Sequence, residues 1–222
     1  MSFFEKAEQL WNENFAEQQK RQWATRLANG HLGLSHYKGF LIETYHNAGL
    51  NPQLQGYATM FLDGRPRNVV KKFFQHAISE IGHDILALND LTELGVNSES
   101  IINSEPQPET SAFFANTIYA IQKNGVVSYL AYLFYLEYTP IKTAPAIMEM
   151  LKAKGVPTKA MSFLEEHATV DVQHLKLMQT YMLEVINSKS KEDLFLKELK
   201  VCSKLHSHVL DAAYENGEKL FG

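Results

Sequence analysis

The sequence has a single cysteine, Cys202, and no apolar run long enough to cross a membrane. One cysteine excludes an internal disulfide framework and fits a reducing compartment. The longest apolar run covers residues 126–136 and is followed by Glu137, whereas a membrane-spanning helix needs about 20 such residues. The first residues also lack the basic and then apolar order of a secretory signal. We therefore expect a cytoplasmic protein that has no membrane partner.

An excess of basic charge is missing as well. The 21 Lys and Arg residues are scattered and the formal net charge is −4, so no nucleic-acid partner is expected. A hydrophobic content of 45% and a charged content of 21% are those of an ordinary globular protein. At 222 residues the chain has the length of one medium-sized domain. We expect a single domain over residues 1–222.

Strand-like alternation of apolar and polar residues is scarce, and nearly every segment has helical periodicity instead. Only residues 96–111 have the polar, proline-containing composition of a linker. The fold class is therefore expected to be all-α, a helical bundle. The sequence predicts helices over residues 3–28, 32–48, 51–62, 66–94, 110–124, 126–138, 143–153, 157–187 and 190–219.

Two motifs of the same form lie on different predicted helices. Each places a histidine, a carboxylate and a second histidine at positions i, i+4 and i+7. Since a helix turns about 100° per residue, each trio falls on one narrow strip of its helix. The stretch FFQHAISEIGHDI contains His76, Glu80 and His83, and the stretch LEEHATVDVQHLK contains His167, Asp171 and His174.

Apolar residues flank both motifs, which indicates that the polar strips are buried. Phe73 and Ile78 flank the first motif, and Phe163 and Leu175 flank the second. Buried imidazole and carboxylate groups are costly unless they are paired or coordinated. They could form hydrogen-bonded networks in the core, or they could share metal ions, as in dimetal carboxylate bundles. The motifs alone leave both interpretations open.

Glu137 and Glu43 are further candidate ligands, because each is an acid within an apolar helix. For Glu137 the alternative is a solvent-facing helix end just before Pro140. His46 follows Glu43 by three residues, and we expect it at the surface or in support of the ligands. Carboxylates mixed with imidazoles suit iron first and manganese second, better than zinc or calcium.

These residues resemble a known family. HAISEIGHDILALNDLTELG (76–95) resembles the Glu-x-x-His helix of haem-oxygenase-like diiron oxidases and oxygenases, and HATVDVQH (167–174) is similar to their second ligand helix. The wider superfamily includes TenA-like thiaminase II, pyrroloquinoline-quinone synthase (PqqC-like) and haem oxygenase. The resemblance, over residues 30–185, implies a haem-oxygenase-like (TenA-like) bundle in which His76 supports the ligands. The implied ligands are Glu43, Glu80, His83, Glu137, His167, Asp171 and His174.

The resemblance also implies an activity, that of a non-haem diiron oxidase or oxygenase. Two iron ions per chain, with manganese as the other candidate, would activate O2 on a small-molecule substrate. Tyr45 and Tyr138 flank candidate ligands in sequence and could act as redox or proton-donor groups, with plain packing as the alternative. The pattern is compatible with a homodimer and does not determine the oligomeric state or the substrate.

Three other functions are compatible with the sequence. A metal-free TenA-like or PqqC-like enzyme of the same fold would need a nucleophile, for which Cys202 is the only thiol. A haem-binding protein would use one histidine as an axial ligand, which leaves the neighbouring carboxylates unexplained. A helical binding protein would use the polar strips only as hydrogen-bonded core networks.

Overall fold

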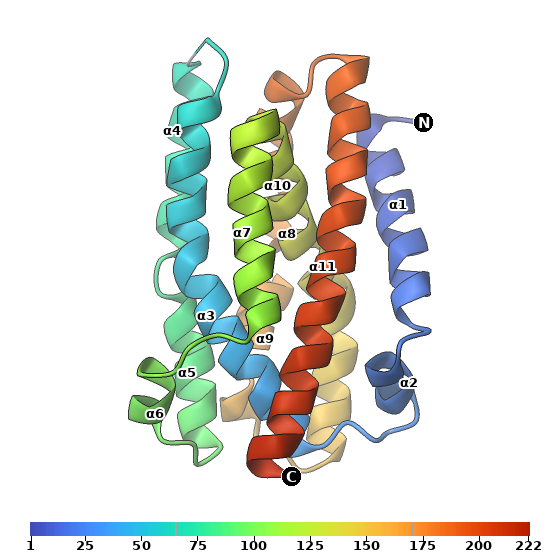
Figure 1. Cartoon of the computed structure of the whole chain (residues 1–222), viewed down its shortest axis with the longest axis vertical. Coiled ribbons are helices and arrows are strands. Elements are labelled where there is room, and N and C mark those ends of the chain that lie inside the picture. The colour runs from blue at the N-terminus through green and yellow to red at the C-terminus, as the bar shows by residue number, and fades with distance from the viewer. Residues whose placement is uncertain (65, 170) are drawn as a thin grey trace.

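The computed structural model describes residues 1–64, 66–169 and 171–222, and within these residues every regular element is a helix (Figure 1). The all-α, single-domain prediction is thereby confirmed. The α-helices are α1 (Phe3–Gln18), α2 (Gln22–Ala28), α3 (Leu34–Ala58), α4 (Arg67–Glu80), α5 (His83–Glu93), α6 (Ser98–Ile102), α7 (Pro108–Asn124), α8 (Val126–Ala153), α9 (Ser162–Thr169), α10 (Asp171–Val185) and α11 (Lys189–Phe221). Two 3-10 turns are η1 (Thr59–Phe61) and η2 (Thr158–Ala160).

The long helices α3, α7, α8 and α11 run along the long axis of the bundle (Figure 1). Helix α11 packs against α3, α8, α1 and α7. Helices α3 and α11 cross closely, because a Cβ atom added to Gly39 would lie 2.0 Å from the carbonyl oxygen of Ala213. A Cβ added to Gly217 would lie 2.3 Å from the carbonyl oxygen of Ser35. The two helix backbones therefore touch at a point where only glycine fits.

Two helices continue beyond the ends that the sequence predicted. Helix α3 continues through Pro52, and α8 continues through Pro140 and Pro145, so the predicted boundaries after residues 48 and 138 are wrong. Packing outweighs the cost of proline inside a helix here, because the first half of α8 is almost completely buried. Glu137 consequently lies inside a buried helix, and the alternative of a solvent-facing helix end does not hold.

Helix breaks occur where the sequence predicted continuity. The predicted helix over 3–28 is divided into α1 and α2, and the one over 66–94 is divided at Ile81 and Gly82. Gly82 has φ of +98°, which ends α4 and redirects the chain. The predicted linker over 96–111 contains the short helix α6. The helix predicted over 157–187 begins later, at Ser162, and its continuity through residue 170 lies outside the described residues.

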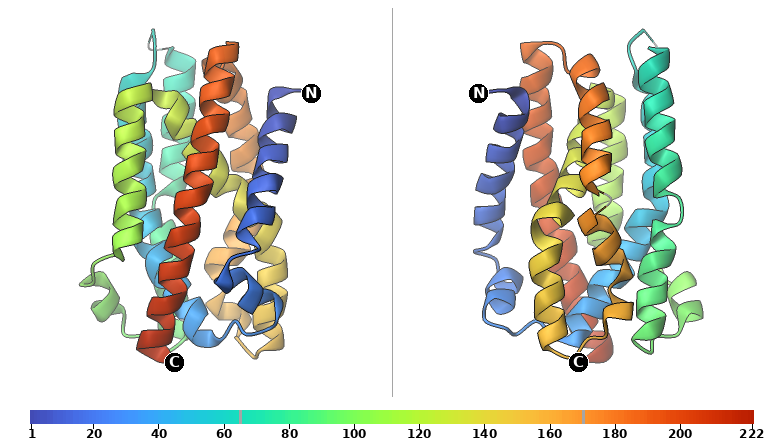
Figure 2. Two further views of the ribbon diagram at one scale, coloured as in Figure 1. Left: turned by 45° about the vertical axis from the view of Figure 1, so that its right-hand side comes forward. Right: turned by 180° about the vertical axis from the view of Figure 1, so that it is seen from behind.

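The two motif-bearing segments lie side by side. Helix α4 packs against α10 and α5 packs against α9, as the rear view in Figure 2 shows. Helix α8 connects two apolar clusters, one that includes Leu130 and Tyr135 and one that includes Ala144 and Leu151. Glu137 lies between these two parts of α8, so a polar site is enclosed by apolar core. None of the helices that the structure describes combines the length and apolar character needed to cross a bilayer.

Candidate metal centre

Five helices bring six of the predicted ligands into one buried region. Helix ends and breaks place most of them, since Glu80 is the last residue of α4 and His83 is the first of α5. The others come from the middle of α8, from α9 and from the first turn of α10. All six side chains are buried: Glu80, His83, Glu137, His167, Asp171 and His174.

The first group of ligand atoms joins α4, α8 and α10. It consists of His76, Glu80, Glu137 and His174, whose ligand atoms lie within 4.8 Å of one another. Nδ1 of His174 is 3.0 Å from Oε1 of Glu80 and 3.3 Å from Oε2 of Glu137. Asp171 lies beside this group, with Oδ1 3.8 Å from Nδ1 of His174. One imidazole thus faces three carboxylates.

The second group consists of Glu80, His83 and His167. Nδ1 of His83 is 3.5 Å from Oε2 of Glu80 and 3.1 Å from Nε2 of His167. Nδ1 of His167 lies 2.8 Å from the carbonyl oxygen of Phe163, to which it can donate only as N–H. This bond leaves Nε2 of His167 free of a proton and available as a ligand atom. Glu80 belongs to both groups, with one oxygen directed at each.

Hydrogen bonding does not account for the atoms at the centre of this arrangement. Oε1 of Glu80, Oε2 of Glu137 and Nδ1 of His174 are buried and have no hydrogen-bond partner among the described residues, although they lie close together. Within the same part of the chain, both carboxylate oxygens of Asp171 are also buried and unpartnered. Leaving so many buried polar atoms unpaired would be costly. Converging lone pairs of this kind fit a bound cation, and the mixture of carboxylate and imidazole fits iron or manganese.

The pKa values of the cluster show the same crowding of negative charge. Burial, together with the charges of Glu137 and Glu80, raises the pKa of Asp171 to about 11. Burial lowers the pKa of His174, but the close carboxylates of Glu137 and Glu80 outweigh it and raise the pKa to about 10. Burial also opposes ionisation of Glu80, yet His174 and His83 bring its pKa below the ordinary value. In the metal-free cluster, protons therefore balance charge that a divalent cation would balance on displacing them.

His76 was predicted to support the ligands, and it lies in contact with them. Its Nε2 is 3.0 Å from Oε1 of Glu137, and its Nδ1 is 2.9 Å from the hydroxyl of Tyr181. Both ring nitrogens therefore have partners, as in a histidine that orients a carboxylate ligand. The hydroxyl of Tyr181 was not found by sequence reasoning, because a tyrosine at helical spacing is indistinguishable from core.

Glu43 is not placed with the other predicted ligands. Its Oε2 accepts hydrogen bonds from the backbone N–H of Gln107 at 3.1 Å and from Oγ1 of Thr110 at 2.5 Å. These groups belong to the first turn of α7, so Glu43 acts as a cap supplied by α3. Among the described residues, neither group of candidate ligand atoms includes Glu43. An acid in an apolar helix can be a helix cap or a metal ligand, and the sequence pattern does not distinguish these two roles.

The other residues proposed from sequence contact different partners. Nε2 of His46 is 3.1 Å from Oγ of Ser104, and Tyr45 packs edge-on against His46. Tyr138 stacks on Phe134 with 5.2 Å between ring centroids. Neither tyrosine is among the described residues that line the cavity beside the cluster.

Asp90 and Asn51 are two supporting residues that sequence reasoning missed. Asp90 on α5 accepts hydrogen bonds from the backbone N–H groups of Ser162 and Phe163, at 2.9 and 3.0 Å. It therefore caps α9 and fixes the start of the helix that carries His167. Nδ2 of Asn51 lies 3.4 Å from Oε2 of Glu80. The sequence predicted that a helix starts at residue 51, where Asn51 precedes Pro52, whereas Asn51 lies inside α3.

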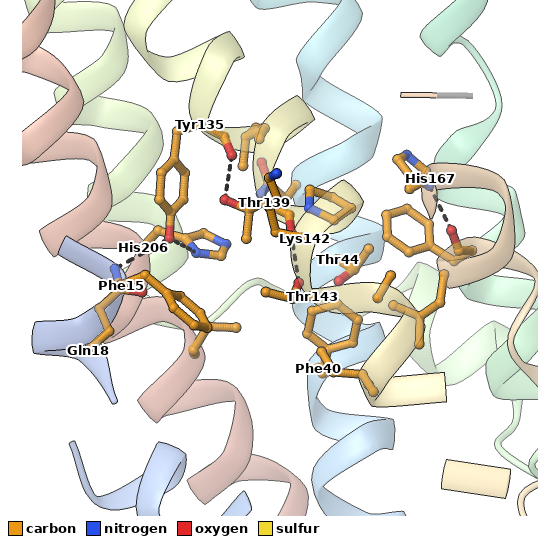
Figure 3. Close-up of a pocket in the computed structure, with 18 of the residues that line it drawn as sticks. Phe15, Gln18, Phe40, Thr44, Tyr135, Thr139, Lys142, Thr143, His167 and His206 are labelled. Carbon is orange, nitrogen blue, oxygen red and sulfur yellow. Dashed lines mark hydrogen bonds between the residues drawn. The ribbon is translucent and has the colours of Figure 1, made fainter. Parts of the chain in front are cut away.

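A cavity of about 430 Å³ adjoins the cluster, a size typical of small-molecule sites. Glu80, Glu137 and His167 contribute to its wall. Figure 3 shows His167 on one side of the cavity, and Tyr135 and His206 on the other. Cys202 is buried and burial raises the pKa of its thiol well above the ordinary value. This thiol is poorly suited to act as a nucleophile.

Comparison with known proteins gives a family and a fold. The family described as iron-containing redox enzymes matches residues 38–203. A domain of unknown function with a haem oxygenase-like fold from Shewanella denitrificans is similar at 21% identity with a TM-score of 0.85, covering 98% of this chain and 92% of that one. A TenA homologue from P. horikoshii is similar at 18% identity with a TM-score of 0.66, covering 96% of each chain. No curated protein matches the sequence.

Proposed function

The chain belongs to the family of iron-containing redox enzymes, and we propose that it is a non-haem diiron oxidase or oxygenase that uses O2 on a small organic substrate. The observation that carries the proposal is the set of buried, converging and unpartnered atoms of Glu80, Glu137, Asp171 and His174. A core network would pair such atoms with one another, whereas a metal centre requires their lone pairs to remain available.

The presence of two groups of ligand atoms supports a proposal of two ions. His83 and His167 would hold one ion, and Glu137 and His174, with Asp171 beside them, would hold the other. Glu80 has one oxygen near each group, so it could contribute a ligand atom to each ion. Iron held by these residues would supply the redox chemistry that reduces O2. Manganese is the other metal that this donor set suits.

The protein's own residues prepare the centre and its surroundings. The bond from His167 to the Phe163 carbonyl sets the ring orientation, and His76 fixes Glu137. The cavity beside Glu137 and His167 is large enough for a small organic molecule and is lined mainly by apolar side chains. Such a lining holds an apolar substrate and excludes water from the reacting atoms.

The activity can be tested by O2 uptake. The protein is loaded anaerobically with ferrous iron, mixed with air-saturated buffer and a panel of small organic compounds, and followed with an oxygen electrode. We expect at least one compound to increase O2 uptake in the parent and not in a His167→Ala, His174→Ala double variant. A His208→Ala variant, altered at an exposed histidine, should behave as the parent. Uptake that is equal in the double variant would contradict the proposal.

The TenA-like fold supports one second candidate, a metal-free enzyme. Its nucleophile would have to be Cys202, which is buried and is not among the described residues that line the cavity. Turnover of a substrate that survives chelation and is abolished by Cys202→Ala would favour this candidate. Turnover that requires iron and survives Cys202→Ala would remove it.

A further inference from the structure

A second polar cluster lies across the cavity from the candidate metal centre. Nε2 of Gln18 donates to the backbone carbonyl and to Oγ of Ser203, both at 2.8 Å, and lies 3.4 Å from the hydroxyl of Tyr135. The Tyr135 hydroxyl is 3.2 Å from Nδ1 of His206. Gln18, Tyr135 and His206 all line the cavity, and Figure 3 shows them together on the side opposite His167.

This cluster carries no charge at neutral pH. Burial lowers the pKa of His206 to about 4, so its imidazole is neutral. Burial raises the pKa of Tyr135 above the ordinary value, so its hydroxyl keeps its proton. Gln18 is uncharged by its chemistry. A charged group of a ligand would find no opposite charge among these three side chains, and its burial here would be costly.

The hydrogen bond between Tyr135 and His206 decides what His206 offers to the cavity. We assign the hydroxyl of Tyr135 as the donor and Nδ1 of His206, 3.2 Å away, as the acceptor. A neutral imidazole that accepts at Nδ1 carries its proton on Nε2. Figure 3 shows the His206 ring extending from Tyr135 toward the cavity. The result is an oriented N–H donor at the far end of the cavity.

The cavity wall between this donor and the metal centre is mainly apolar, although Thr44 and Lys142 also belong to it (Figure 3). Phe40 and Ile147 form part of the wall. Thr139 and Thr143 also line it, but their hydroxyls donate to the carbonyl oxygens of Tyr135 and Thr139, at 2.6 and 2.9 Å. These hydroxyl groups therefore donate to the backbone of α8 and not to a ligand in the cavity. A ligand that spans the cavity would be apolar along its middle.

We propose that His206 binds a neutral hydrogen-bond acceptor of the substrate, a carbonyl or hydroxyl oxygen, and so places the apolar remainder of the molecule beside Glu137 and His167. The inference rests on the proposed function, because it names the substrate class of the same site. It makes His206 a specificity-determining residue that is remote from the reacting atoms. It also predicts discrimination against ligands with a charged head group.

Binding to the iron-free protein tests the inference separately from the oxidation. Isothermal titration calorimetry is run with three eight-carbon probes, namely 2-octanone, octanoate and octylamine. We expect 2-octanone to bind most tightly. Tighter binding of octanoate would overturn the inference, and would point instead to Lys142, an exposed cation that lines the cavity.

Variants then test the donor itself. His206→Phe keeps an aromatic ring without the N–H and should weaken 2-octanone binding about fivefold, as expected for one hydrogen bond. His208→Phe, on the same helix and exposed, should bind as the parent does. Equal affinity of His206→Phe and the parent would overturn the inference.

A second variant covers the case in which His206→Phe fails to fold. Tyr135→Phe removes the hydroxyl that fixes the proton on Nε2 of His206 and should weaken 2-octanone binding about twofold. Unchanged affinity for 2-octanone in a folded Tyr135→Phe protein would overturn the assignment of Nε2 of His206 as the hydrogen-bond donor. All titrations use iron-free protein, so a result that contradicts the role of His206 does not contradict the iron proposal. A result that contradicts the iron proposal likewise does not change the measured affinities.

Discussion

Glu80 and His83 lie on opposite sides of a helix break, yet Oε2 of Glu80 is 3.5 Å from Nδ1 of His83. Glu80 ends α4, His83 begins α5, and Gly82 between them has φ of +98°. On a continuous helix the two side chains would share one strip of surface. The break instead sets their relative direction, so that Glu80 also reaches His174 on α10.

Gly82→Ala should destabilise the protein by about 1 kcal/mol, because a side chain is strained at positive φ. Space is not the reason, since none of the described residues lies within 4 Å of a Cβ added there. Urea unfolding of the iron-free protein measures the change. Gly56→Ala is the matched control, because its added Cβ also meets none of the described residues within 4 Å but lies in the helix α3. Equal free energies of unfolding for Gly82→Ala and the parent would contradict the expected strain of an alanine at this positive φ.

Gly39→Ala should destabilise the protein more strongly, by about 3 kcal/mol, because both helix backbones would have to separate. The added Cβ would lie 2.0 Å from the carbonyl oxygen of Ala213 and 2.8 Å from Cα of Gly217. The free energy of unfolding in urea checks this value, with Gly56→Ala again as the control. A loss no larger than that of Gly82→Ala would show that the α3–α11 crossing relaxes easily.

Glu43→Ala should lower stability by about 1 to 2 kcal/mol without lowering the iron content. It removes the acceptor of the Gln107 and Thr110 hydrogen bonds at the start of α7. Glu43→Gln keeps an oxygen acceptor and should lose less. Iron analysis of both variants decides between cap and ligand. Loss of iron in a folded Glu43→Gln protein would return Glu43 to the ligand set.

The pH dependence of stability should include a contribution from His206. Burial lowers its folded-state pKa to about 4, while the unfolded value is about 6.5. Between these two pH values the unfolded chain therefore binds more protons than the folded chain. The contribution of neutral His206 to the free energy of unfolding is complete above about pH 6.5 and decreases as the pH falls toward 4. The rings of Phe113 and Tyr135 pack against His206, and Lys142 lines the same cavity.

Melting temperatures of the parent and of His206→Asn test this contribution. Between about pH 7 and pH 5 the melting temperature of the parent should fall more than that of the variant, because asparagine does not titrate. His208→Asn should fall as much as the parent. Equal decreases in the parent and in His206→Asn would contradict a depressed pKa at His206.

The sequence predicted the bundle and most of the buried cluster, because periodicity and the repeated His-acid-His spacing are local properties. It did not predict the break at Gly82, since a glycine inside a strongly periodic segment is often tolerated. It ended helices after residues 48 and 138, whereas packing of buried faces carries α3 through Pro52 and α8 through Pro140. It did not distinguish Glu43, which caps α7, from Glu137, which lies among the candidate ligands. Only the tertiary structure shows that the start of α7 lies next to Glu43.

The partners of the motif residues were hidden for the same reason. Tyr181 reaches His76 and Asn51 reaches Glu80 only through the packing of α10 and α3 beside α4. No short-range pattern marks either residue. The homodimer and the reducing, cytoplasmic environment remain predictions from the sequence.

The iron content of the protein tests the account most directly. Anaerobic loading with ferrous iron, removal of free metal and elemental analysis are applied to the parent, to the His167→Ala, His174→Ala double variant and to His208→Ala. We expect two iron ions per chain in the parent and in His208→Ala, and a loss of iron in the double variant. No iron in the loaded parent, or the same amount in the folded double variant, would contradict a metal centre at these residues.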